Sequence, residues 1–120
     1  MISALVFEDD VLILKDMLAR LRHLGCRALG SRYITGGKAK IKRLHPDVIF
    51  LDFMFEDGHT GAELVKEIAG ECDTRIVFVS AYKKDEIKKN LEAAWIKYSY
   101  ISKPFANEDL EKAICTIKEH

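Results

Sequence analysis

The chain has 120 residues, a length that suits a single domain with one hydrophobic core. Its 19 basic and 19 acidic residues balance, so no net charge favours nucleic acid or an anionic membrane as a partner. Three widely spaced cysteines argue against a disulfide framework or a zinc site, and no apolar run reaches the ~18 to 20 residues of a membrane span, so we expect a cytoplasmic protein.

The first third of the chain predicts two strands and two helices. An apolar run at residues 4–7 predicts a strand, and a leucine stripe with a period near 3.6 follows it. Asp10 is suited to cap the N-terminus of that first helix. A weaker apolar run at residues 26–31 predicts the second strand. Residues 35–44 have a thin apolar stripe and a Gly-Gly pair near their start, so we expect a short or mobile second helix there.

The middle of the chain contains a clear strand followed by a clear helix start. Residues 48–51 are continuously apolar, which is typical of a strand in a parallel sheet covered on both faces. Thr60 and Glu63 match a capping box ahead of an apolar stripe. The third helix is therefore predicted to begin near Gly61.

The last third predicts two further strands and two further helices. Apolar runs at residues 76–79 and 98–102 predict the strands. The helical stripe between them contains Ile87 and Leu91 and extends to Ala94 or Trp95. A final helix carries Leu110, Ile114 and Ile117, with acids in its first turns that suit the helix dipole.

Five strands that alternate with five helices predict an α/β fold with a doubly wound parallel sheet. Parallel neighbours need crossover connections, and these connections are right-handed. All the carboxyl ends of such strands lie along one edge, and ligands bind there, where the strand order reverses. Residues that directly follow the strands are therefore the candidates for a functional site.

Four of the five apolar runs end in chemically active side chains, namely Glu8, Asp9, Asp52, Ser80 and Lys103. Three carboxylates close together would repel one another, so the site needs a positive partner. Oxygen ligands without thiolates or suitably spaced histidines favour Mg²⁺ over zinc. A carboxylate nucleophile, a cation site, a lysine and a hydroxyl together indicate a site that receives a phosphoryl group. Taken singly, each side chain is also typical of a solvated cap, turn or surface position.

The order and spacing of four motifs resemble the receiver domain of two-component response regulators over essentially the whole chain. These motifs are the acid pair in VFEDD, Asp52 in PDVIFLD, Ser80 in VFVSAY and Lys103-Pro104 in YISKPF. The resemblance implies a flavodoxin-like (βα)5 fold with strand order 2-1-3-4-5. It also implies a single receiver domain over residues 1–120, without an output domain.

The resemblance assigns roles to the acidic pocket. Asp52 is expected to accept a phosphoryl group from the phosphohistidine of a sensor histidine kinase or a phosphotransfer protein. Asp9 and Asp52 would bind Mg²⁺ directly, with the backbone carbonyl of Met54 as a third ligand and Glu8 acting through water. Lys103 would contact Asp52 and then the phosphoryl oxygens.

The resemblance also implies a switch. Ser80 would move to bond the phosphoryl group, and Tyr100 would change rotamer in step, altering a surface that binds a downstream protein or output domain. The Lys103-Pro104 peptide is expected to be cis. We expect a monomer or weak dimer that does not bind nucleic acid directly, and no enzyme beyond self-phosphorylation and slow autodephosphorylation.

Three positions depart from the pattern of the family, and other functions stay open. The family often has Pro where this chain has Glu56, and Gly-Ala where it has Ile96 and Lys97. These departures raise the alternative of a degenerate receiver that only docks to other proteins. A haloacid dehalogenase type phosphatase would need a second Asp at Met54, and a flavin protein would need a phosphate loop after the first strand.

Overall fold

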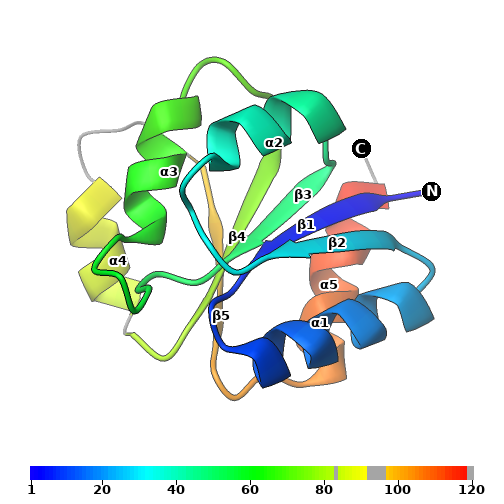
Figure 1. Ribbon diagram of the computed structural model, residues 1–120. Helices are drawn as coiled ribbons and strands as arrows, with labels where there is room; N and C mark the ends of the chain where they lie inside the picture. Colours follow the sequence, from blue (N-terminus) through cyan, green and yellow to red (C-terminus); the bar gives the residue numbers. More distant parts are fainter. Residues whose placement is uncertain (83, 92–96, 119–120) are drawn as a thin grey trace.

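The computed structural model describes residues 1–82, 84–91 and 97–118 (Figure 1). Within these ranges five strands alternate with five helices, as predicted. In chain order they are β1 (Ser3–Phe7), α1 (Val11–His23), β2 (Arg27–Ser31), α2 (Gly37–Leu44), β3 (Val48–Leu51), α3 (Gly61–Ile68), β4 (Arg75–Ser80), α4 (Lys84–Leu91), β5 (Ser99–Ser102) and α5 (Asn107–Lys118).

The strands form one parallel sheet in the order β2-β1-β3-β4-β5. This result confirms the doubly wound sheet and its predicted strand order. Phe7 is in register with Leu51, and Ser80 with Ser102, so the strands end close to a common level. The loops that follow them therefore gather at one edge, on the side of the sheet away from the N-terminus in Figure 1.

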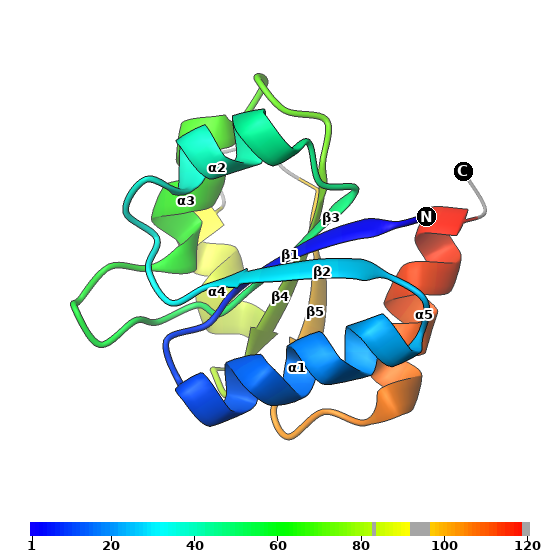
Figure 2. The ribbon, with the colours of Figure 1, turned by 45° about the vertical axis from the view of Figure 1, so that its right-hand side comes forward.

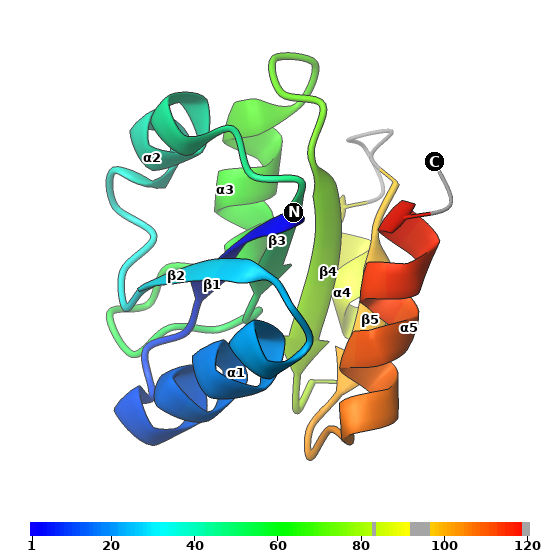
Figure 3. The ribbon, with the colours of Figure 1, turned by 90° about the vertical axis from the view of Figure 1, so that its right-hand side faces the viewer.

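Helices cover both faces of the sheet. Figures 2 and 3 show α1 and α5 on one face and α2, α3 and α4 on the other. Successive residues of a strand point to opposite faces, so Phe7 and Phe78 pack toward α2, α3 and α4, while Val6 and Val79 pack toward α1 and α5. Burial on both faces explains why the central strands read as continuous apolar runs.

The predicted N-terminal caps are present. Asp10 Oδ1 accepts hydrogen bonds from the backbone N–H groups of Leu12 and Ile13, at 2.9 and 3.1 Å. At the start of α3, the Thr60 hydroxyl accepts from the Glu63 N–H at 3.4 Å, and Glu63 Oε2 accepts from the Thr60 N–H at 2.6 Å. Together these two bonds form the capping box, and α3 begins at Gly61 as expected.

Replacing Thr60 tests the contribution of this cap. Thr60→Ala removes the hydroxyl acceptor and should lower the free energy of unfolding by about 1 kcal/mol, measured by urea denaturation. Thr60→Ser keeps an acceptor at the same place and is the control that should stay close to the parent protein. Equal stability of the two variants would contradict a stabilising cap.

The second helix is short, as the sequence indicated. Gly36 precedes it in the left-handed conformation, with a φ of 78°, and α2 spans eight residues. Ile87 and Leu91 are buried in α4 as expected, whereas the predicted continuation to Ala94 or Trp95 lies outside the described residues. None of the described helices is both long and apolar enough to cross a membrane.

Candidate functional site

The carboxyl edge of the sheet brings the predicted site residues into position through backbone hydrogen bonds that continue past the strands. The Asp52 N–H donates to the carbonyl of Phe7 at 3.1 Å, which joins the end of β3 to β1. The Lys103 N–H donates to the carbonyl of Ser80 at 2.9 Å, which joins the end of β5 to β4. These bonds hold Asp52 beside the end of β1 and Lys103 beside the end of β4.

Lys103 links two of the three acids. Its Nζ donates to Glu8 Oε1 at 2.7 Å and to Asp52 Oδ2 at 3.0 Å. The side chains of Lys103, Asp52 and Glu8 are 18%, 12% and 2% exposed, respectively. Because little water reaches this cluster, its charges interact more strongly than charges on an open surface do.

Glu8, Asp9 and Asp52 together form a candidate metal site. One carboxylate oxygen from each residue lies within 4.8 Å of the others. Two full negative charges at that distance repel by about 3 to 4 kcal/mol at an effective dielectric constant near 20. In the described part of the chain, Glu8 Oε2 is buried and lacks a hydrogen-bond partner. An all-oxygen donor set with a buried, unpaired oxygen fits a hard divalent cation such as Mg²⁺.

The titration behaviour of the pocket reflects this crowding of charge. The pKa of Glu8 is raised to about 8, first by burial and then by the adjacent Asp52 carboxylate, while Lys103 acts in the opposite direction. The pKa of Lys103 is also raised, because the contacts with Glu8 and Asp52 outweigh the effect of burial, which alone would lower it. Lys103 is therefore a permanent positive charge beside Asp52.

Two backbone N–H groups hold the carboxylates, and the sequence did not reveal either. The Phe53 N–H donates to Asp52 Oδ1 at 2.7 Å, and the Glu56 N–H donates to Asp9 Oδ2 at 2.7 Å. Both donors belong to the loop between β3 and α3. This loop therefore contacts, through its main chain, the carboxylates that follow β1 and β3, and residue type does not indicate such backbone contacts.

Met54 lies in the same loop, in an isolated antiparallel bridge with Thr60. The two hydrogen bonds beside this bridge run from the Phe55 N–H to the His59 carbonyl and from the Gly61 N–H to the Phe53 carbonyl. Met54 and Thr60 therefore face each other as a pair without a mutual hydrogen bond, and the Met54 carbonyl takes no part in the two bonds of this bridge.

Ser80 is the last residue of β4, and Tyr100 lies on the neighbouring strand β5, in register with Phe78. The Ser80 side chain is buried, and its hydroxyl accepts a hydrogen bond from the Tyr82 N–H at 3.1 Å. The Tyr100 hydroxyl donates to the Ser80 carbonyl at 3.3 Å and is also bonded to the Tyr82 carbonyl. The two predicted switch residues are thus connected through the start of the loop that follows β4.

The positions that depart from the pattern of the family have different surroundings. Glu56 is exposed, and its N–H makes the bond to Asp9 described above. Lys97 is exposed just before β5, and Ile96 lies outside the described residues. The Lys103-Pro104 peptide is cis, which confirms that expectation.

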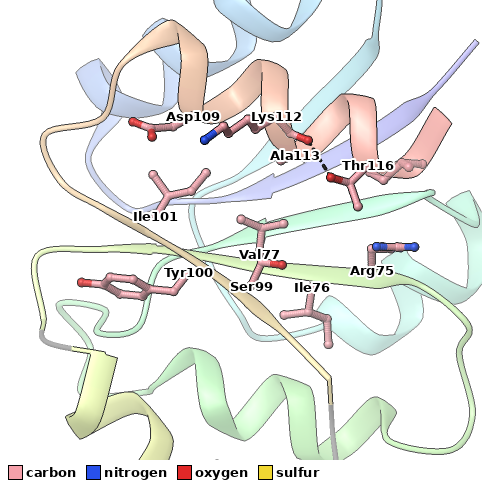
Figure 4. A pocket seen from close by; sticks show the side chains of 11 residues that line it. Arg75, Ile76, Val77, Ser99, Tyr100, Ile101, Asp109, Lys112, Ala113 and Thr116 are labelled. Carbon is pink, nitrogen blue, oxygen red and sulfur yellow. Dashed lines mark hydrogen bonds between the residues drawn. The ribbon is translucent and has the colours of Figure 1, made fainter. Parts of the chain in front are cut away.

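A separate surface hollow of about 210 Å³ lies between β4, β5 and α5 (Figure 4). The figure shows Val77 and Ile101 pointing toward α5, while Tyr100 points to the opposite side of the strand. Glu8, Asp9 and Asp52, the acids of the candidate metal site, do not line this hollow. It is therefore distinct from the pocket that contains Asp52.

Comparison with known sequences gives a consistent picture. Residues 4–115 match the family model of the response regulator receiver domain. A protein of Vibrio cholerae described as an uncharacterized response regulatory protein is 32% identical over 117 residues, which cover 95% of this chain and 47% of that protein. Protein PilG of Pseudomonas aeruginosa is 27% identical over 116 residues, or 94% of this chain and 84% of PilG. The chain thus spans about half the length of the Vibrio relative and most of PilG.

Comparison with solved structures gives the same fold. The crystal structure of a two-component response regulator from Clostridium difficile superimposes with a TM-score of 0.86. The superposition covers 100% of this chain and 98% of the other, at 22% sequence identity. At this level of identity the likeness concerns the arrangement of strands and helices alone.

Proposed function

The chain belongs to the response regulator receiver domain family, and on that premise we propose that Asp52 accepts a phosphoryl group from a phosphohistidine of a partner protein. One observation carries the proposal most directly. Lys103 Nζ lies between Glu8 and Asp52, at 2.7 and 3.0 Å, with Asp9 beside them. A carboxylate held next to a fixed positive charge and to further oxygen ligands is suited to in-line phosphoryl transfer.

The transfer would use the groups of this pocket in defined roles. An oxygen of Asp52 attacks the phosphorus as the bond from phosphorus to the donor imidazole breaks, and the imidazole nitrogen keeps the electron pair of that bond. The product is an acyl phosphate on Asp52. Lys103, already within hydrogen-bond distance of Asp52, compensates the negative charge that develops on the phosphoryl oxygens.

The pocket also supports a role for Mg²⁺. Asp9 and Asp52 would hold the ion with the carbonyl of Met54, and Glu8 would contribute through water. When bound, the ion would neutralise charge and bring the attacking carboxylate and the phosphoryl oxygens together. The buried, unpaired Glu8 Oε2 supports this assignment, because a nearby cation removes the cost of burying a carboxylate oxygen.

Phosphorylation would be communicated through Ser80 and Tyr100. The buried Ser80 hydroxyl would exchange its bond with the Tyr82 N–H for one with the phosphoryl group. Because the Tyr100 hydroxyl is bonded to the carbonyls of Ser80 and Tyr82, movement of this segment would release Tyr100. The new charge on Asp52 would then bias the surface around β4 and β5 between two states.

The partners follow from this role. The donor would be a sensor histidine kinase or a phosphotransfer protein, and the recipient of the signal a downstream protein or an output domain. We propose that residues 1–120 form one receiver domain that acts in the cytoplasm as a monomer or weak dimer. Its catalytic activity would be limited to self-phosphorylation and slow loss of the phosphoryl group.

Labelling with a small phosphodonor tests the proposal. Incubation with acetyl phosphate and Mg²⁺ should add one phosphoryl group to the intact mass, and excess EDTA should prevent the addition. Beryllofluoride with Mg²⁺ should form an equivalent complex, visible as a change in tyrosine fluorescence. If neither reagent modifies the folded protein, the domain is a degenerate receiver that only docks, and the proposal is refuted.

A further inference from the structure

In the loop between β3 and α3, the backbone N–H of residue 56 contacts Asp9, one of the acids of the candidate metal site. A proline at this position could not make the contact. The Glu56 N–H donates to Asp9 Oδ2 at 2.7 Å, a short distance that is typical of a hydrogen bond to a charged acceptor. A prolyl residue lacks this N–H group and could not form the bond. The contact is therefore specific to a chain with another residue at this position.

The loop holds this N–H group in place through a tight turn. The Gly58 N–H donates to the Phe55 carbonyl at 3.0 Å, which closes a β-turn with Glu56 and Asp57 at its centre. The Phe55 N–H donates to the His59 carbonyl at 3.0 Å and ties both ends of the turn together. Phe55 is also buried, in the core cluster on the face of the sheet that α2, α3 and α4 cover. The donor is thus fixed by local hydrogen bonds and by packing.

Asp9 is held from a second direction as well. Arg32 Nε donates to the backbone carbonyl of Asp9 at 3.3 Å. The main chain of Asp9 is thus contacted from the loop after β2, and its side chain from the loop after β3. The carboxylate whose Oδ2 accepts the Glu56 N–H is the same one that lies, through one of its oxygens, within 4.8 Å of oxygens of Glu8 and Asp52.

We propose that the backbone N–H of Glu56 is a positioning group of the cation site, which turns the Asp9 carboxylate toward the shared pocket before the ion arrives. Mg²⁺ requires nearly ideal octahedral geometry, so its affinity is sensitive to the orientation of each ligand. Groups that orient metal ligands typically change metal affinity by roughly 10- to 100-fold when they are removed. The importance of this contact for phosphoryl transfer rests on the proposed function, whereas its effect on Mg²⁺ binding does not.

A pair of substitutions separates the N–H group from the glutamate side chain. Glu56→Ala removes the carboxylate and keeps the N–H, whereas Glu56→Pro removes both. Proline is favoured at the second position of a β-turn, which is where Glu56 stands, so Glu56→Pro is compatible with this turn. A difference between the two variants therefore reports on the hydrogen bond to Asp9.

Isothermal titration calorimetry with MgCl₂ is the measurement. Glu56→Pro should bind Mg²⁺ roughly tenfold more weakly than Glu56→Ala, while circular dichroism shows both variants folded without metal. With acetyl phosphate, Glu56→Pro should need more Mg²⁺ for labelling yet approach the rate of Glu56→Ala at saturating Mg²⁺. Equal affinities in the two variants, or a parent protein that does not bind Mg²⁺, would overturn the inference.

A second measurement on the parent protein keeps the inference testable if Glu56→Pro does not fold. In ¹⁵N-¹H spectra the Glu56 amide proton should lie far downfield and exchange slowly, and Asp9→Ala should shift it upfield and speed its exchange. An amide unaffected by Asp9→Ala would refute the contact. Mg²⁺ binding that depends on residue 56 without any labelling of Asp52 would instead leave the inference standing and remove the proposed function.

Discussion

Asp52→Asn should abolish the incorporation of acid-labile phosphate from acetyl phosphate. The amide is not a nucleophile, and an acyl phosphate cannot form on it. The substitution preserves the size of the side chain, and Lys103 keeps its bond to Glu8 at 2.7 Å, so the fold should be retained. Intact mass spectrometry in the presence of Mg²⁺ would measure the loss, and circular dichroism would confirm that the variant is folded.

The control for this prediction is another aspartate on the same molecule. Asp73 is exposed between α3 and β4, at the opposite edge of the sheet from Asp52. Asp73→Asn removes one negative charge without touching the pocket and should be labelled as fully as the parent protein. Undiminished labelling of Asp52→Asn, with the phosphate mapped to Asp9 or Asp57, would contradict the assignment of the acceptor.

The parts of the site that were predicted from the sequence are those that strand topology determines. Glu8, Asp52 and Lys103 each follow an apolar run directly, and the carboxyl ends of parallel strands meet at one edge. Once the runs were identified as strands of one sheet, the proximity of these side chains followed. In the structure Lys103 contacts both Glu8 and Asp52, as this topology predicts.

The parts that were not predicted depend on the path of the loop between β3 and α3. From the sequence, Glu56 was identified only as a departure from a proline that is common in the family. The structure shows that its N–H bonds to Asp9 and that it lies in a hydrogen-bonded turn. A backbone donor is present at every residue except proline, so residue type alone cannot indicate which one meets a carboxylate.

Gly61 was likewise read only as the start of a helix, and its packing predicts a second large effect. A Cβ atom built on Gly61 would lie 2.3 Å from the backbone oxygen of Asp52 and 2.9 Å from Cγ of Leu51. The first contact is with main chain at the end of a buried strand, which cannot rotate away as a flexible side chain could. Gly61→Ala should therefore lower the free energy of unfolding by about 3 kcal/mol or more, at the upper end of typical overpacking costs.

Gly70 lies just beyond the other end of α3 and provides the matched control. It has a φ of 76°, and a Cβ atom there would meet nothing within 4 Å, so Gly70→Ala should cost only about 1 kcal/mol of backbone strain. Urea denaturation of both variants would measure the difference. Since relief of the clash at Gly61 requires either Asp52 or the start of α3 to move, we also expect slower labelling of the folded Gly61→Ala variant. Equal stability of the two variants would show that α3 can shift away from the acceptor strand at little cost, contrary to the close packing seen here.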